Sequence, residues 1–189
     1  MLKTFVDRVS NDLRESQLNW KVAFLLIPIA FFTYFFHEFG HWVFGEVLGN
    51  DMTISLNNSA PRSGYFMNNS SALWSAIGGP AFTIFQSLVF LSVVRRTKSI
   101  YAYSVLFFAV FSRYFSITFG GFSLQDEARI SSMLGVNTYL TAMIVLLILF
   151  LILWRSNLMM KLNLKAVGYF TACCTFVNLM VIGVNHVIK

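Results

Sequence analysis

Five apolar runs, each near the roughly 20 residues that a helix needs to cross a hydrocarbon core, restrict the fold more than any other feature of this chain. Because lipid offers no hydrogen-bond partners, such runs must be helices that satisfy their own backbone groups. With 57% hydrophobic and only 12% charged residues, the 189-residue chain does not have the composition of an ordinary soluble domain. The runs lie at residues 22–48, 72–94, 99–119, 137–154 and 166–188.

The sequence therefore predicts an all-α integral membrane protein, a bundle of about five transmembrane helices that forms one domain over residues 1–189. Residues 1–20 have apolar positions three to four apart, which favours an amphipathic helix on the membrane surface or a helical extension of the first span. Residues 50–71 are polar and rich in turn residues. They predict a short surface β-hairpin with strands at 53–56 and 65–67.

Positive charges are distributed unevenly between the two sides of this five-span map. Of the 14 Lys and Arg residues, ten fall on the side of the N-terminus, Arg113 lies inside the third run, and three fall on the other side: Arg62, Arg129 and Lys189. By the positive-inside tendency we expect a multi-pass protein of the cell membrane with its N-terminus in the cytoplasm. The basic residues form short clusters between apolar spans, so we expect the lipid bilayer and no nucleic acid as partner.

Two histidines and a glutamate interrupt the first run in the pattern H-E-x-x-H, as His37, Glu38 and His41. The four-residue separation brings both imidazoles to one face of a helix, where they can hold one metal ion. Zinc in such a site acidifies a bound water, and Glu38 can accept the proton as the catalytic base. A charge in mid-bilayer costs about 2.5–3.5 kcal/mol on insertion scales, which favours a functional role over helix-joining hydrogen bonds.

Two imidazoles and a water leave a tetrahedral zinc ion one protein ligand short. We expect Asp126 to be that ligand, because it follows the third run on the same membrane side as the C-terminal half of the first. Glu127 is the competing carboxylate, and Asp126 could instead form a helix-capping pair with Ser123. The prediction is one Zn²⁺ per chain, and His186 is expected to be a packed or interfacial residue rather than a ligand.

Gly78, Gly79 and Pro80 open the second run. They predict either a loosened helix whose free backbone groups bind the substrate, or a close contact between two helices. Asn178, in the last run, could supply an amide to the site or join helices by a hydrogen bond.

Arg113 is a charged residue in the middle of the third run, and two explanations are open. Its guanidinium could pair with a carboxylate, for which Glu46, Asp126 and Glu127 are candidates. Alternatively its long side chain could snorkel to the membrane surface.

Over roughly residues 22–130 the chain resembles the site-2 protease family of intramembrane zinc metalloproteases, in particular its compact members. The resemblance is carried by HEFGH in the first run, the hairpin after it, and AIGGPAF at the start of the second run. It implies that His37, His41 and Asp126 bind zinc and that Glu38 is the base. It also implies cleavage of transmembrane segments in membrane-protein substrates.

The chain departs from that family in two stretches. Widespread members carry asparagine-proline-glycine and leucine-aspartate-glycine, where this chain has residues 78–80 and then Leu124, Gln125 and Asp126. The family holds its zinc nearer the cytosolic face, whereas the charge distribution places residues 37–41 in the outer half of the membrane.

The predicted function is an intramembrane zinc metalloendopeptidase that hydrolyses peptide bonds in or near transmembrane segments. One alternative is a prenyl-protein-type membrane protease, which commonly takes a glutamate as its third ligand. Another is a metal-binding membrane transporter or scaffold without proteolysis. The sequence names neither the substrate nor any partner that gates access to the site.

Overall fold

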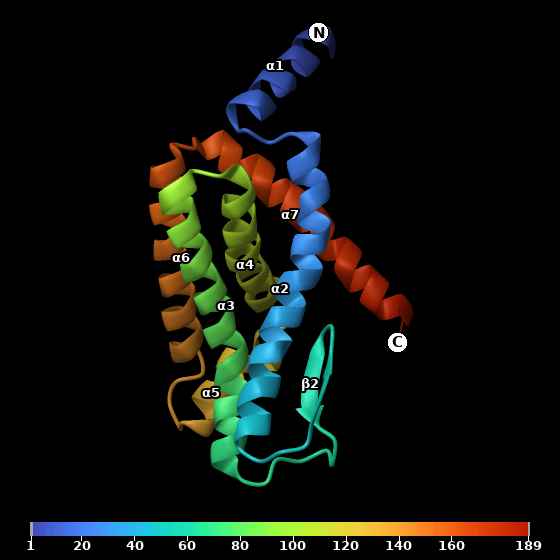
Figure 1. Cartoon of the computed structure of the whole chain (residues 1–189), viewed down its shortest axis with the longest axis vertical. Coiled ribbons are helices and arrows are strands. Elements are labelled where there is room, and N and C mark those ends of the chain that lie inside the picture. The colour runs from blue at the N-terminus through green and yellow to red at the C-terminus, as the bar shows by residue number, and fades with distance from the viewer. Residues whose placement is uncertain (1, 189) are drawn as a thin grey trace.

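The computed structural model describes residues 2–188, with the side chains of residue 7 and of residues 9–184. This part of the chain is mostly helical and contains one two-stranded antiparallel sheet (Figure 1). The elements are α1 (Leu2–Glu15), α2 (Trp20–Val47), β1 (Met52–Ser55), β2 (Asn58–Pro61), α3 (Asn69–Thr97), α4 (Ile100–Phe119), the 3₁₀ turn η1 (Phe122–Leu124), α5 (Asp126–Met133), α6 (Leu140–Met160) and α7 (Leu164–Ile188).

Five of the described helices are long and apolar enough to cross a membrane: α2, α3, α4, α6 and the first 21 residues of α7. They correspond one to one with the predicted spans and are consistent with a multi-pass membrane protein. Their bounds differ by a few residues, and at the start of α2 and α3 the reason is a short polar side chain, which hydropathy ignores. The Asn19 and Asn68 side chains accept hydrogen bonds from the first turns of α2 and α3, at 3.1 Å and 2.8 Å.

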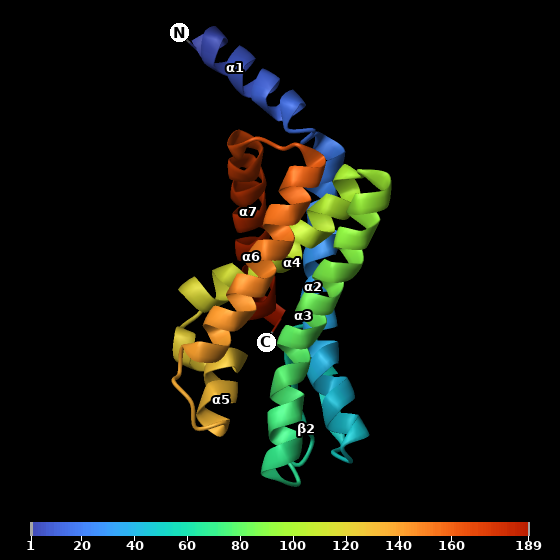
Figure 2. The same cartoon turned by 90° about the vertical axis from the view of Figure 1, so that its left-hand side faces the viewer.

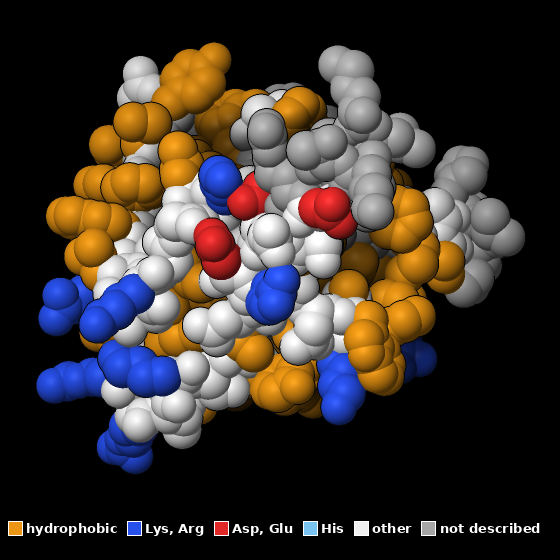
Figure 3. Space-filling model, turned by 90° about the horizontal axis from the view of Figure 1, so that it is seen from above, with side chains coloured by type: hydrophobic (Ala, Val, Ile, Leu, Met, Phe, Trp, Pro, Cys, Tyr) orange, Lys and Arg blue, Asp and Glu red, His pale blue; other side chains and the backbone are white. Residues whose placement is uncertain are grey.

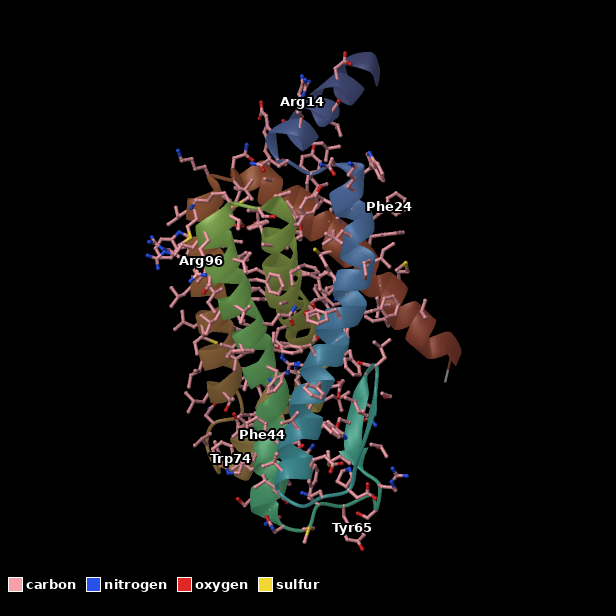
Figure 4. All side chains as sticks on the ribbon, in the orientation of Figure 1. Arg14, Phe24, Phe44, Tyr65, Trp74 and Arg96 are labelled. Carbon is pink, nitrogen blue, oxygen red and sulfur yellow. The ribbon has the colours of Figure 1, made fainter. Side chains whose placement is uncertain are left out.

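The bundle is built around α2, α3 and α4, which pack against one another, while α6 packs on α3 and α4 and α7 packs on α2 and α4 (Figures 1 and 2). Large apolar side chains point outward, which is compatible with a lipid-facing surface: Phe24, Phe85, Leu147 and Phe176 are each more than half exposed. Figure 4 shows Phe24 on this outer surface and Phe44 of α2 beside Trp74 of α3, whose rings stack with centroids 6.2 Å apart.

The bundle has two different ends. We call the end with α1 and the loops 98–99 and 161–163 the basic end, and the end with the hairpin and α5 the hairpin end. Looking down on the basic end, Figure 3 shows a group of Lys and Arg side chains on the side of α3 and α6 and further ones spread over the rest of this end. The uneven charge distribution is thus a property of the fold, whereas the orientation of the bundle in a membrane stays a prediction.

Helix α1 is separate from α2. Gln17 has a left-handed backbone conformation with φ of 56°, which breaks the helix between Glu15 and Trp20, so the alternative of a helical extension is wrong. Lys165 of α7 donates to Asp12 of α1 at 2.9 Å and ties the two helices together. The side chains of residues 2–6 lie outside the described part, and the membrane-surface location of α1 stays a prediction.

The hairpin forms where it is predicted, but with a different second strand. Ser55 pairs with Asn58 around a two-residue turn, so β2 follows at once and the predicted strand at 65–67 is wrong. A two-residue connection brings the next residues directly into register, and Pro61, which lacks an N–H, is tolerated at the end of a strand. The aromatic Tyr65, which suggested a strand, is 74% exposed.

Candidate metal centre

The two histidines of α2 and the first residue of α5 form a group that could hold a metal ion. The Nε2 atoms of His37 and His41 lie 3.3 Å apart, and Oδ2 of Asp126 lies 3.1 Å and 3.5 Å from them. Four residues of separation put the imidazoles one helical turn apart, and α4 together with η1 returns the chain so that α5 begins beside them. The prediction that these three residues meet is confirmed.

The spacing of the three ligand atoms fits zinc. A tetrahedral ion with Zn–N and Zn–O bonds of about 2.0–2.1 Å separates its ligand atoms by about 3.3 Å. The measured separations of 3.1, 3.3 and 3.5 Å bracket that value. The group supplies three ligands, so a fourth position is left for water or substrate, as in catalytic zinc sites.

Hydrogen bonds on the far side of each ring fix the tautomers that such a site needs. His41 donates from Nδ1 to the carbonyl of Ser75 at 2.7 Å. His37 donates from Nδ1 to the Thr83 hydroxyl at 2.9 Å, and that hydroxyl donates onward to the Gly79 carbonyl at 3.2 Å. Both Nε2 atoms therefore carry lone pairs that point toward the same space as a carboxylate oxygen. The repulsion between these lone pairs is relieved only by a shared cation or proton.

Helix α3 approaches α2 closely at this level because glycines face each other. A Cβ on Gly78 would lie 2.6 Å from the backbone carbon of Gly40, and one on Gly79 would lie 2.7 Å from Cε1 of His37. Helix α3 runs unbroken from Asn69 to Thr97 through Pro80, so of the two readings of this stretch the close helix contact is observed. A role of Gly78, Gly79 and Pro80 in substrate binding stays a prediction.

Arg113 of α4 holds the two adjacent carboxylates of α5 in different roles. It donates from Nε to Glu127 at 2.7 Å, from Nη2 to the other oxygen of Glu127, and from Nη2 to Oδ2 of Asp126 at 3.0 Å. Arg113 is 7% exposed and Glu127 is fully buried, so snorkelling to the surface is wrong for this arginine. Glu127 is thereby taken up by the guanidinium, and Asp126 is left facing the histidines.

Asp126 is arranged as an anionic ligand rather than as a helix cap. Gln125 is the N-cap residue of α5 and no side chain among the described residues caps that helix, so the capping pair with Ser123 is wrong. Burial alone would raise the pKa of the Asp126 carboxyl, but hydrogen bonds with His37 and His41 and the charge of Arg113 hold that pKa well below its usual value. The carboxylate therefore stays ionised at neutral pH.

The group opens into a cavity of about 340 Å³ at the hairpin end. Of its eighteen lining residues only Phe66 and Leu124 have wholly apolar side chains. Glu38 lines the cavity beside the histidines, with the backbone of Ser59 in β2 next to its carboxyl group. The cavity thus combines a candidate metal group, an unligated carboxyl and a mainly polar wall.

Other residues singled out in the sequence lie away from this group. Glu46 accepts a hydrogen bond from the Met52 amide at 2.9 Å at the end of α2. Asn178 accepts one from the Tyr34 hydroxyl at 2.8 Å, which joins α7 to α2 and is the helix-joining alternative. The side chain of His186 lies outside the described residues.

Ser75 and Thr83 support the histidines, and sequence reasoning missed them. With Gly79 they fall four residues apart on one face of α3, and a stripe of small and polar residues within an apolar span is the signal that could have found them. Ser75 bonds His41 twice, because its hydroxyl also donates to the His41 carbonyl at 2.9 Å.

Comparisons of this chain with protein-family models, with curated proteins and with solved structures found no match.

Proposed function

We propose that the protein is an integral membrane zinc metalloendopeptidase that hydrolyses peptide bonds in or near transmembrane segments of other proteins. One observation carries the proposal. Three ligand atoms from His37, His41 and Asp126 lie at the spacing of a zinc tetrahedron, in a cavity that Glu38 also lines. Ligands of this kind with an open position and a free carboxyl beside them are the parts of a metal-assisted hydrolase.

Each residue has a distinct role in this proposal. Zinc bound there would supply an acidified water and polarise the scissile carbonyl. Glu38 accepts the proton of the attacking water and delivers it to the leaving amine. Thr83 and Ser75 hold the rings in their ligating tautomers, and Arg113 orients Asp126 while it keeps Glu127 away from the group.

The hairpin offers a way to present the substrate. Arg62 donates from its amide to Asp51 at 2.7 Å, and the alternation of an antiparallel pair then directs the backbone groups of Ser59 away from β1. A helical substrate hides its peptide bonds and must unwind before water can attack. An unwound segment could pair with this edge of β2, next to Glu38.

A prenyl-protein-type protease fits the contacts less well, because the glutamate that would be its third ligand is occupied. Glu127 receives two hydrogen bonds from Arg113 and lies outside the His37, His41 and Asp126 group. Asp126 is therefore the ligand that we propose.

The test is reconstitution of the purified protein in lipid vesicles with model transmembrane substrates, together with zinc analysis. Glu38→Gln should keep about one zinc per chain and lose cleavage by roughly 10²–10⁴-fold, the usual contribution of a general base. Glu46→Gln is the matched control, since Glu46 lies on the same helix outside the cavity. Undiminished cleavage by Glu38→Gln, or a His41→Ala protein that keeps its zinc, would overturn the proposal.

A further inference from the structure

Arg129 is a cation at the cavity that the proposed chemistry does not use. It lies on α5 three residues after Asp126, nearly one helical turn further along the same side, and it lines the same cavity. Its guanidinium lies 5.5 Å from the centre of the Phe66 ring, a cation–π contact with one of the two wholly apolar residues in the lining.

Arg113 and Arg129 differ in whether a carboxylate of the protein pairs with them. Arg113 is buried and paired with two carboxylates. Arg129 is exposed and forms no ion pair with the side chains that the structure describes, those of residue 7 and of residues 9–184. An arginine fork held against an aromatic ring at the wall of a polar cavity is a preformed donor for a carboxylate.

The charge balance of the cavity favours the same ligand. Counted as ionised, Glu38, Asp126 and Glu127 oppose Arg113 and Arg129, which leaves one net negative charge. A divalent cation at the metal group turns that into one net positive charge. In a site shielded by helices, a single carboxylate brought by the substrate would neutralise it.

We propose that Arg129 forms a specificity subsite for a carboxylate of the substrate, an acidic side chain close to the scissile bond. The inference rests on the proposed function and names the chemistry that this cavity selects. The Cβ atoms of Asp126 and Arg129 are about 5–6 Å apart, as for any helical pair at this spacing. At about 3.3 Å per extended residue, this separation spans roughly two residues, so the acidic residue lies roughly two positions from the bond held at the metal.

Binding and cleavage can be measured separately. The binding probe is a set of fluorescent leucine–alanine transmembrane peptides that differ only in a glutamate, glutamine or lysine, moved in turn through four successive positions. The receptor is the full-length, zinc-loaded Glu38→Gln chain in lipid nanodiscs, so that bound peptide stays intact. At one position the glutamate peptide should bind roughly tenfold more tightly than its glutamine counterpart, between the effects of exposed and buried charge pairs.

Adding Arg129→Gln should abolish this preference, Arg129→Lys should keep part of it, and Arg129→Glu should invert it toward the lysine peptide. The control is Arg62→Gln, which removes a positive charge from the same end of the bundle but outside the cavity lining. It should leave the preference unchanged. Equal zinc content in all variants keeps the comparison valid, and Arg129 is exposed enough that its substitutions should fold.

Equal binding of the glutamate and glutamine peptides at all four positions would overturn the subsite, and so would an Arg129→Gln protein that still discriminates. Cleavage of the same peptides by the chain with Glu38 intact tests the proposed function on its own. Selective binding without cleavage would contradict the protease proposal and support the subsite. Cleavage without charge preference would support the protease proposal and contradict the subsite.

Discussion

The two halves of the bundle differ in what fills the space between the helices, although α2, α3 and α4 run through both. Toward the basic end, the rings of Tyr103, Phe107 and Phe170 pack with centroids 5.1–5.7 Å apart and are almost wholly buried. Toward the hairpin end, the same helices enclose the polar cavity. Helix α4 changes from one character to the other between Phe107 and Ser112, little more than one turn.

This difference bears on which functions suit the fold. The lining of the cavity reaches no nearer to the basic end than Thr33, Thr83 and Ser112, and the aromatic core lies beyond them. A transporter needs a polar route across the bilayer, whereas a hydrolase needs a wet pocket on a rigid, well-packed base. The apolar core therefore counts against a polar route through the bundle and is compatible with the hydrolase that we propose.

The largest expected effect is on zinc binding, and it distinguishes Asp126 from its neighbour Glu127. Asp126→Asn removes a charged ligand and should abolish stoichiometric zinc binding. Glu127→Gln removes the same charge but keeps hydrogen-bonding capacity toward Arg113, so zinc affinity should fall by no more than about tenfold. Metal analysis of the two purified proteins, with zinc titration, measures both. Equal zinc loss in the two would mean that the carboxylates are not divided between metal and arginine as their contacts indicate.

A second prediction concerns the support of His37. Thr83→Val keeps the shape of the side chain but removes the acceptor for Nδ1. Zinc affinity should fall by about 10–100-fold, as for other groups that orient a ligating histidine. Thr175→Val is the control, since its hydroxyl bonds the Thr171 carbonyl within α7. Unchanged affinity in Thr83→Val would show that helix packing alone orients the ring.

Much of this site could be predicted from the sequence because its central relation is local. His37, Glu38 and His41 are placed by helical geometry alone, and five alternating spans bring Asp126 to the same side. The choice between Asp126 and Glu127 could not be settled in that way. The two are about 100° apart on α5, and which one faces the histidines depends on the rotation of α5 against Arg113.

The same limit explains what was predicted wrongly or missed. Hydropathy identifies a span but not the hydrogen-bond partners within it. The roles of the Ser75 and Thr83 hydroxyls become visible only in the packing of α3 against α2. In the hairpin, the second strand is Asn58–Pro61 and not residues 65–67, although the latter have strand propensity. The two-residue turn sets the register, whatever the propensity of the residues that follow.

Substitutions in the aromatic core toward the basic end should lower the stability of the protein and leave its zinc binding unchanged. Phe170 is fully buried against Tyr103 and Phe107, and Phe170→Ala leaves a cavity of about 100 Å³, worth about 2 kcal/mol at about 24 cal/mol per Å³. If the chain is a membrane protein as proposed, its unfolded helices stay in lipid and transfer from water adds little. Phe176→Ala, on the exposed face of α7, should cost much less. Unfolding in mixed micelles and zinc analysis test this, and zinc loss in Phe170→Ala would show that the halves are coupled.

The smallest effect is expected for the ion pair of the basic end. Lys165 and Asp12 meet at 2.9 Å, but the lysine side chain is 63% exposed, and an exposed ion pair contributes little to stability because water and salt screen it. Asp12→Asn should therefore leave the free energy of unfolding almost unchanged and leave the zinc content the same. Removing one partner of a buried pair such as Arg113 and Glu127 costs about 3–5 kcal/mol, because a charge is left without compensation. A loss of that size in Asp12→Asn, measured by unfolding in mixed micelles, would mean that the contact of α1 with α7 is as important to stability as the pair beside the metal group.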